Sequence, residues 1–134
     1  MNKNSTGEAK RTVEPTDSAR QLIMTAADDF PDVFSTSKMV ALMETAAARA
    51  MRDELGEGQL SVGVDVRIRH LAATPIGAEV YAKAIFLGMQ GKLYLFRVHA
   101  YDQGGLIGEG EHTRAVVTTE RLMQGAWTRI YRPA

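Results

Sequence analysis

Residues 37–55 read SKMVALMETAAARAMRDEL and carry apolar side chains at the spacing of one face of an α-helix. The stripe consists of Met39, Leu42, Met43, Ala46, Ala47, Ala50 and Met51. Ser35, Thr36 or Ser37 can cap the start of this helix, and Gly56 is placed to end it. Because the stripe is rich in Ala and Met, we expect a curved sheet to wrap closely around the helix.

After this helix the apolar period changes to two, which is typical of strands. In the stretch SVGVDVRIRH the alternating apolar residues are Val62, Val64, Val66 and Ile68. The predicted strands span about residues 61–70, 78–89, 92–102 and 106–119. Compact hairpin connections such as Gln90-Gly91 separate the later strands. One long helix followed by such strands predicts an α+β domain, with an antiparallel sheet curled around a single central helix.

Both ends of the chain carry weaker patterns. Residues 1–11 are polar and predict a disordered leader, so the single domain is expected to span residues 12–134. The apolar run Leu22-Ile23-Met24 can pair as an edge strand. The last residues, which include Trp127 and Tyr131, are expected to pack back on the surface as a short helix or tail.

Composition excludes several classes of function. The 134 residues fit one core, and 16 basic residues balance 16 acidic ones, which argues against a nucleic-acid partner. The chain has no cysteine, so disulfides and a thiol nucleophile are excluded. Its first ten residues lack an apolar signal region, and no stretch reaches the ~20 apolar residues that span a bilayer. These features predict a soluble cytoplasmic protein without a membrane partner.

The predicted sheet has long edge strands, and one helix cannot cover both of its faces. Extension of the sheet across a second copy would remove an exposed edge. We therefore expect a homodimer.

Three polar residues interrupt otherwise apolar surfaces. His70 continues the phase of Val66 and Ile68, and its reference pKa of ~6.5 suits proton exchange. Glu44 lies at the margin of the helical stripe, where burial would prepare a carboxylate for general-base or nucleophilic work. Thr36 lies at a helix N-terminus, where backbone N–H groups can hold an oxyanion. A hydrogen-bonded strand-end histidine, a solvent-facing glutamate and a simple N-cap are the structural alternatives.

The spacing of Thr36 and Glu44 constrains any shared site. Eight helical residues correspond to ~12 Å along the axis, so the two side chains do not meet in a straight helix. Either Thr36 lies in a loop that folds back, or a partner chain supplies one component. Other patterns are weaker: His70, His99 and His112 lack the spacing of a metal site, and we predict none.

Four segments in order resemble the fluoroacetyl-CoA thioesterase-like branch of the hot-dog superfamily. They are Phe30–Thr36, Met39–Glu44, Gly63–Pro75 and Ile107–Val117. The resemblance implies a hot-dog fold, a homodimer with CoA thioesters along the subunit interface, and neither a metal nor a redox cofactor. It also implies that Thr36, Glu44 and His70 are catalytic and that the Gly63 backbone lies close to the thioester.

The resemblance leaves the acyl group open. The pocket wall is expected to include Phe30, Val33 and Phe34, while the small Ala27 would admit longer or differently shaped acyl chains. Candidate side chains for the CoA phosphates are Arg67, Arg69 and Arg114, although solvated surface arginines are the commoner explanation.

These observations predict a thioesterase that hydrolyses a small or medium acyl-CoA. Glu44 would attack the carbonyl or activate water, Thr36 would orient it, and His70 would move the proton. One alternative is a non-catalytic hot-dog module that binds acyl-CoA or another small hydrophobic ligand. Another is a hot-dog hydratase or dehydratase, whose different Asp/His arrangement is not evident in the sequence. A pure binder would need none of the three polar residues.

Overall fold

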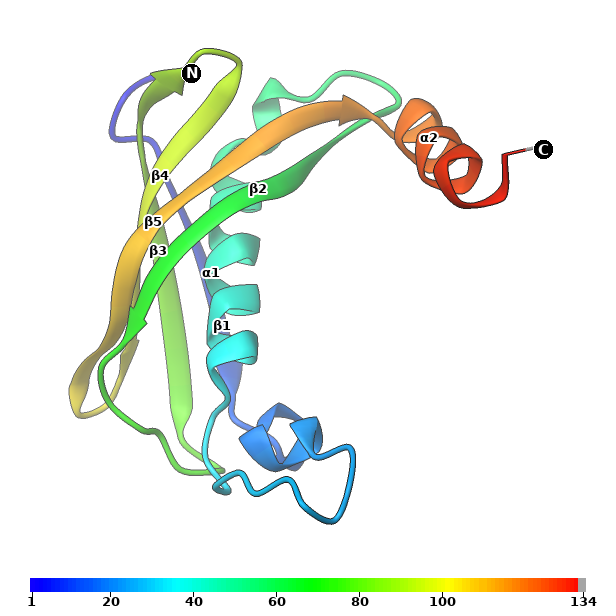
Figure 1. Ribbon diagram of the computed structural model, residues 1–134. Helices are drawn as coiled ribbons and strands as arrows, with labels where there is room; N and C mark the ends of the chain where they lie inside the picture. The colour runs from blue at the N-terminus through cyan, green and yellow to red at the C-terminus, as the bar shows by residue number, and fades with distance from the viewer. Residues whose placement is uncertain (133–134) are drawn as a thin grey trace.

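The computed structural model describes residues 1–132, in which a five-stranded antiparallel sheet curls around one long helix (Figure 1). The strands are β1 (Thr6–Thr12), β2 (Gln59–His70), β3 (Glu79–Gln90), β4 (Leu93–Asp102) and β5 (Gly105–Thr118), in the order β1-β3-β4-β5-β2. The helices are α1 (Thr36–Ala50) and α2 (Thr119–Tyr131), with 3-10 turns at Pro15–Asp17, Ala19–Leu22 and Arg52–Glu54. The predicted α+β architecture is confirmed, and each predicted strand is found within two residues of its expected bounds.

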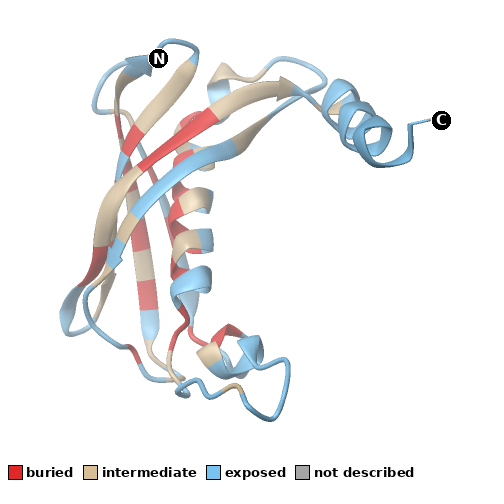
Figure 2. Cartoon of the chain, viewed as in Figure 1, coloured by how far each residue is buried: buried red, intermediate tan, exposed pale blue. Residues whose placement is uncertain are grey.

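The core lies between α1 and the concave face of the sheet (Figure 2). The buried side chains of α1 are Met39, Leu42, Met43, Ala46 and Ala47. Those of the sheet include Ala82, Ala84, Phe86, Phe96, Val98 and Ala100. Small alanines on both surfaces let the helix approach the strands closely. The expected close wrapping of the sheet is therefore confirmed.

Helix α1 begins as expected and ends earlier. The Ser35 hydroxyl caps it by accepting a 3.1 Å hydrogen bond from the Lys38 backbone N–H. Met51 leaves the helical conformation with φ −108° and ψ 12°, and the 3-10 turn Arg52–Glu54 follows. The helix therefore does not continue to Gly56, the residue that the sequence suggested would end it.

Two predictions for the first thirty residues are wrong. Residues 6–11 are not a disordered leader, because they belong to β1, which pairs with β3 and buries Ala9. The inward side chains of β1 are too small to produce a visible apolar alternation. The run Leu22-Ile23-Met24 is not an edge strand: Leu22 ends a 3-10 turn, and all three side chains are exposed.

Helix α2 extends away from the sheet instead of packing back on it (Figure 1). None of its residues is buried, and Trp127 is 68% exposed. The expected terminal helix is thus present, whereas its expected packing is wrong. Within residues 1–132, neither helix has the length and apolar character needed to cross a membrane.

A β-bulge in β2 changes which side chains face the helix. The register shifts between Gly63, opposite Arg114, and Asp65, opposite Thr113. After the bulge, Val66 lies opposite the buried His112, and His70 opposite Gly108. The predicted phase is correct for Val66, Ile68 and His70. It is wrong for Val62 and Val64, because the bulge instead directs Ser61 and Gly63 toward α1.

Candidate active site

Thr36 and His70 meet at the N-terminal end of α1. The Thr36 Oγ1 lies 2.7 Å from the His70 Nδ1, a hydrogen-bonding distance. The other ring nitrogen, Nε2, is buried and has no partner among the described residues. Burial is the main cause that lowers the pKa of the His70 ring below its ordinary value. The pair therefore combines a hydroxyl with an imidazole that is neutral at pH 7 and has a free nitrogen.

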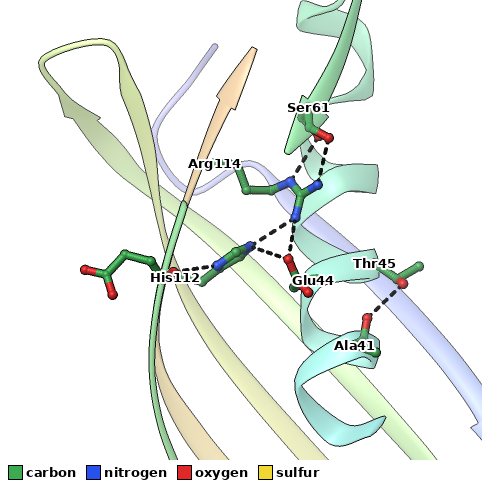
Figure 3. Close-up of polar contacts among 7 residues, drawn as sticks. Ala41, Glu44, Thr45, Ser61, His112 and Arg114 are labelled. Atoms are coloured by element: carbon green, nitrogen blue, oxygen red, sulfur yellow. Dashed lines mark hydrogen bonds and ion pairs between the residues drawn. The ribbon is translucent and has the colours of Figure 1, made fainter. Parts of the chain in front are cut away.

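Glu44 belongs to a second polar cluster, further along α1 (Figure 3). Its Oε1 accepts a 3.2 Å hydrogen bond from the Nη1 of Arg114. Arg114 also donates to Ser61, at 3.0 Å from Nε to the hydroxyl and at 2.9 Å from Nη2 to the carbonyl oxygen. The Glu44 side chain remains 39% exposed, so a ligand can reach a carboxylate that an arginine already orients.

His112 completes this cluster from the adjacent part of β5. It is 2% exposed, and its Nε2 lies 3.1 Å from the Arg114 Nη1 and 3.9 Å from the Glu44 Oε1. Sequence reasoning considered His112 only as a metal ligand and missed Ser61 entirely. The two-residue spacing of His112 and Arg114 could have placed both on one face of the strand.

Gly63 leaves the space that the Glu44 carboxylate occupies. An added Cβ would collide with the Glu44 Oε1 and lie 3.1 Å from the His112 Cε1. Beside this point, a shallow groove of about 520 Å³ is lined by Glu44, Ser61 and Arg114 and by residues near the end of α1. Gly63 thus lies beside Glu44, and its closeness to a thioester stays a prediction.

Replacement of Gly63 by alanine tests this packing. Because the added methyl group claims the position of the Glu44 Oε1, we expect the carboxylate to be displaced and kcat to fall roughly 100-fold. Steady-state thiol release from an acyl-CoA measures the effect. Gly125→Ala in α2, where an added Cβ meets nothing within 4 Å, serves as a comparison for glycine replacement away from the site. Wild-type kcat in Gly63→Ala would contradict the assignment.

One chain does not bring Thr36 and Glu44 together. Both residues are part of α1, at its first turn and its third, so the loop that folds back is ruled out. Their positions differ by eight residues, or ~12 Å along the helix. Each chain thus presents two separate polar groups, Thr36 with His70 and Glu44 with Arg114, which we call the two candidate half-sites.

The predicted substrate-binding residues divide into accessible and buried ones. Phe30 is 39% exposed and Val33 is half-buried, so both can line a ligand site. Phe34 is 1% exposed and belongs to the hydrophobic core, which corrects its assignment to the pocket wall.

The arginines proposed for the CoA phosphates are also placed differently. Arg114 is buried and its guanidinium is engaged by Glu44 and Ser61, so it is not a free phosphate ligand. Arg69 donates a 2.8 Å hydrogen bond to Glu109 on the convex face, away from His70. Among the described residues, no three His, Asp or Glu side chains gather as a metal site would require.

Sequence comparison identifies the family of the chain. Residues 13–120 match the sequence model of the family described as fluoroacetyl-CoA-specific thioesterase. The chain belongs to this family. A curated fluoroacetyl-CoA thioesterase from Streptantibioticus cattleyicolor is 42% identical over 94 residues, which are 70% of this chain and 68% of that protein.

Solved structures of other proteins have the same fold as this member of the fluoroacetyl-CoA-specific thioesterase family. A fluoroacetyl-CoA thioesterase variant in complex with acetyl-CoA superposes with a TM-score of 0.88 at 34% identity, covering 99% of this chain and all of that one. A hot-dog-like protein from Thermanaerovibrio acidaminovorans superposes with a TM-score of 0.83 at 23% identity, covering 98% and 94% of the two chains. The predicted hot-dog fold is confirmed.

Proposed function

We propose that this protein hydrolyses a small or medium acyl-CoA thioester to the free acid and CoA. The proposal rests on the two half-sites, one a hydroxyl–imidazole pair and the other a carboxylate that an arginine orients. Both occur in a member of the fluoroacetyl-CoA-specific thioesterase family. A relative of known structure was solved with acetyl-CoA, which supports a CoA thioester as the ligand class.

We further propose that a homodimer completes the site. Strand β2 is at the edge of the sheet and is largely exposed (Figure 2). Its concave-facing residue Val66 is exposed, although its cross-strand neighbour His112 is buried. A second copy that paired along this edge would cover Val66 and remove the unpaired edge.

Two-fold symmetry gives this pairing a functional consequence. An isologous contact between two β2 strands is antiparallel, so the His70 end of one strand lies beside the Gly63 end of the other. Thr36 and His70 of one subunit would then face Glu44 of the partner subunit. This arrangement resolves the separation of the two half-sites along α1.

The shared site can carry out thioester hydrolysis. Glu44 uses its carboxylate oxygen to attack the thioester carbonyl or to take a proton from the attacking water, and Arg114 fixes its direction. We propose that a backbone N–H at the start of α1 or at Gly63 stabilises the oxyanion. Thr36 orients the reacting groups. The neutral His70 accepts the proton that the attacking water releases, directly or through Glu44, and passes it to the departing CoA thiolate.

The site requires no metal or redox cofactor for this reaction. Phe30 and Val33 are the accessible apolar residues for the acyl group, and Ala27, three residues before Phe30 in the chain, is exposed and small. The cysteine-free sequence suits the cytoplasm, where we place the enzyme.

A thiol-release assay over acyl-CoAs of increasing chain length tests the proposal. We expect turnover of at least one short or medium acyl-CoA well above the uncatalysed rate. A protein that binds these thioesters, as measured by calorimetry, and hydrolyses none would instead be a non-catalytic binding module.

The pH dependence of the reaction tests the role of His70. Because burial lowers its pKa below 6.5, the neutral ring that can accept a proton persists at pH 7 and is lost only at lower pH. We expect kcat/KM to be constant near neutrality and to fall along an acid limb centred below pH 6.5. The residual activity of His70→Gln is expected to lack this limb. A limb centred above pH 6.5 would contradict the assignment.

A further inference from the structure

His112 is buried between the bulge of β2 and the Arg114–Glu44 pair, and the catalytic steps above leave it without a task (Figure 3). Its Nδ1 lies 2.8 Å from the backbone carbonyl oxygen of Asp65. Its Nε2 lies 3.1 Å from the Nη1 of Arg114. Both ring nitrogens therefore have a partner, although the ring is almost completely removed from solvent.

The two partners determine the protonation of the ring. A carbonyl oxygen only accepts hydrogen bonds, so Nδ1 must carry a proton and donate it to Asp65. A guanidinium only donates, so Nε2 must be unprotonated and accept from Arg114. The contacts thus require the neutral ring with its proton on Nδ1. The cationic ring would have no acceptor for Arg114.

The surrounding charges favour the same state. The groups that face the ring are Asp65 on β2, Glu44 on α1 and Arg114 on β5. Burial is the largest effect and lowers the pKa of His112, and the positive charge of Arg114 lowers it further. The Asp65 carbonyl contact and Glu44 act in the opposite direction and are outweighed. Of the two groups in ion-pair contact with Glu44, Arg114 is therefore the one that is positively charged near pH 7.

The β2 bulge makes this contact possible. Asp65 lies directly after the register shift, where the regular ladder with β5 is interrupted and a carbonyl can turn toward a side chain. Gly63 lies on the other side of the shift and has no side chain. A Cβ at this position would lie 3.1 Å from the His112 Cε1. The bulge and the glycine together create the space and the acceptor for the His112 ring.

We propose that His112 is a positioning residue, whose neutral Nδ1–H ring holds the Nη1 of Arg114 against Glu44 and thereby aims the Glu44 carboxylate. The inference rests on the proposed function, in which Glu44 acts on the thioester. Nη1 is the only Arg114 nitrogen that contacts Glu44, since Nε and Nη2 donate to Ser61. If the His112 Nε2 is not available as an acceptor, the Arg114 Nη1 loses the contact that fixes its position relative to the Glu44 carboxylate.

The tautomer can be observed without any activity. In long-range ¹H–¹⁵N spectra of the ¹⁵N-labelled full chain at pH 7, we expect His112 to show a protonated Nδ1 and an unprotonated Nε2. The chain contains 3 histidines, so comparison with His112→Gln assigns the signals. A proton on Nε2, or a cationic ring, would overturn the proposal.

Two substitutions separate the acceptor from the rest of the ring. Glutamine at position 112 can place its amide oxygen where Nε2 accepts from Arg114, whereas asparagine reaches only the Asp65 carbonyl. We expect His112→Asn to lower kcat roughly 10- to 100-fold with little change in KM, and His112→Gln to recover most of this loss. His99→Asn, on the convex face of β4, is the matched control and is expected to keep wild-type kcat.

The comparison of these two variants decides the kinetic role. Equal losses of kcat in both, or wild-type kcat in His112→Asn, would overturn it. Thermal unfolding of each variant shows whether a loss of kcat reflects a loss of stability. If the two variants are equally stable, a difference in their kcat values has another cause. A wild-type protein that hydrolyses no thioester would refute the proposed function and the kinetic role together. The NMR result would still decide the hydrogen bonding of His112 on its own.

Discussion

Glu44→Gln is expected to lower kcat for acyl-CoA hydrolysis about 1000-fold or more. The amide has nearly the shape of the carboxylate, and its oxygen can still accept the hydrogen bond from Arg114, so the local structure is retained. It can neither attack the thioester carbonyl nor take a proton from water. The loss should therefore appear in kcat, while KM changes little.

Thiol release over a panel of acyl-CoAs measures this loss. Glu57→Gln, in the exposed loop before β2, makes the same chemical change away from the site and should keep wild-type activity. Thermal unfolding of both variants checks that the fold is intact. Full activity in Glu44→Gln would remove the carboxylate from the mechanism, even if the protein were a thioesterase.

Two inactive variants are expected to restore activity when they share a dimer. In a heterodimer of Glu44→Gln with His70→Ala, one of the two sites combines an intact His70 with an intact Glu44 from the other chain. Random co-assembly makes about half of the dimers mixed, so the mixture should reach about a quarter of wild-type activity from nearly none. Co-expression with two affinity tags, followed by tandem purification, isolates the mixed dimer.

The double variant Glu44→Gln/His70→Ala provides the opposite control. When it is paired with the wild-type chain, every shared site has one damaged component, so the mixed dimer should be inactive. If each chain contained a complete site, the wild-type half would remain active and the two single variants would not complement. An active monomer in a sizing experiment would also contradict a shared site.

The parts of the fold that follow a local period were predictable from the sequence. Helix α1 and strands β2 to β5 each have an apolar repeat long enough to be recognised, and the spacing within α1 correctly separated Thr36 from Glu44. Strand β1 was missed because its inward residues, Gly7 and Ala9, are too small to produce an apolar signal.

The parts of the site that depend on long-range pairing were not predictable in the same way. Ser61 appeared as an outward residue, because the alternation of β2 was extended through a bulge that only the pairing with β5 reveals. Arg114 appeared as a surface residue, although it is buried between Ser61 and Glu44. Only the two-residue spacing of His112 and Arg114 was visible in the sequence. The contacts of His112 with Asp65 and Glu44 were not, because those residues are distant in sequence.

The bulge of β2 also has a consequence for how related sequences are read. Gly63 and His70 both face the helix, yet they are seven residues apart, and in an uninterrupted strand an odd separation puts two side chains on opposite faces. The odd separation of Gly63 and His70 therefore indicates that the strand contains one extra residue, the bulge. A relative in which one residue between these positions was gained or lost would have to abandon either the bulge or the common orientation of its glycine and histidine. Odd spacing is therefore a test, available from sequence alone, of which relatives can build the same site.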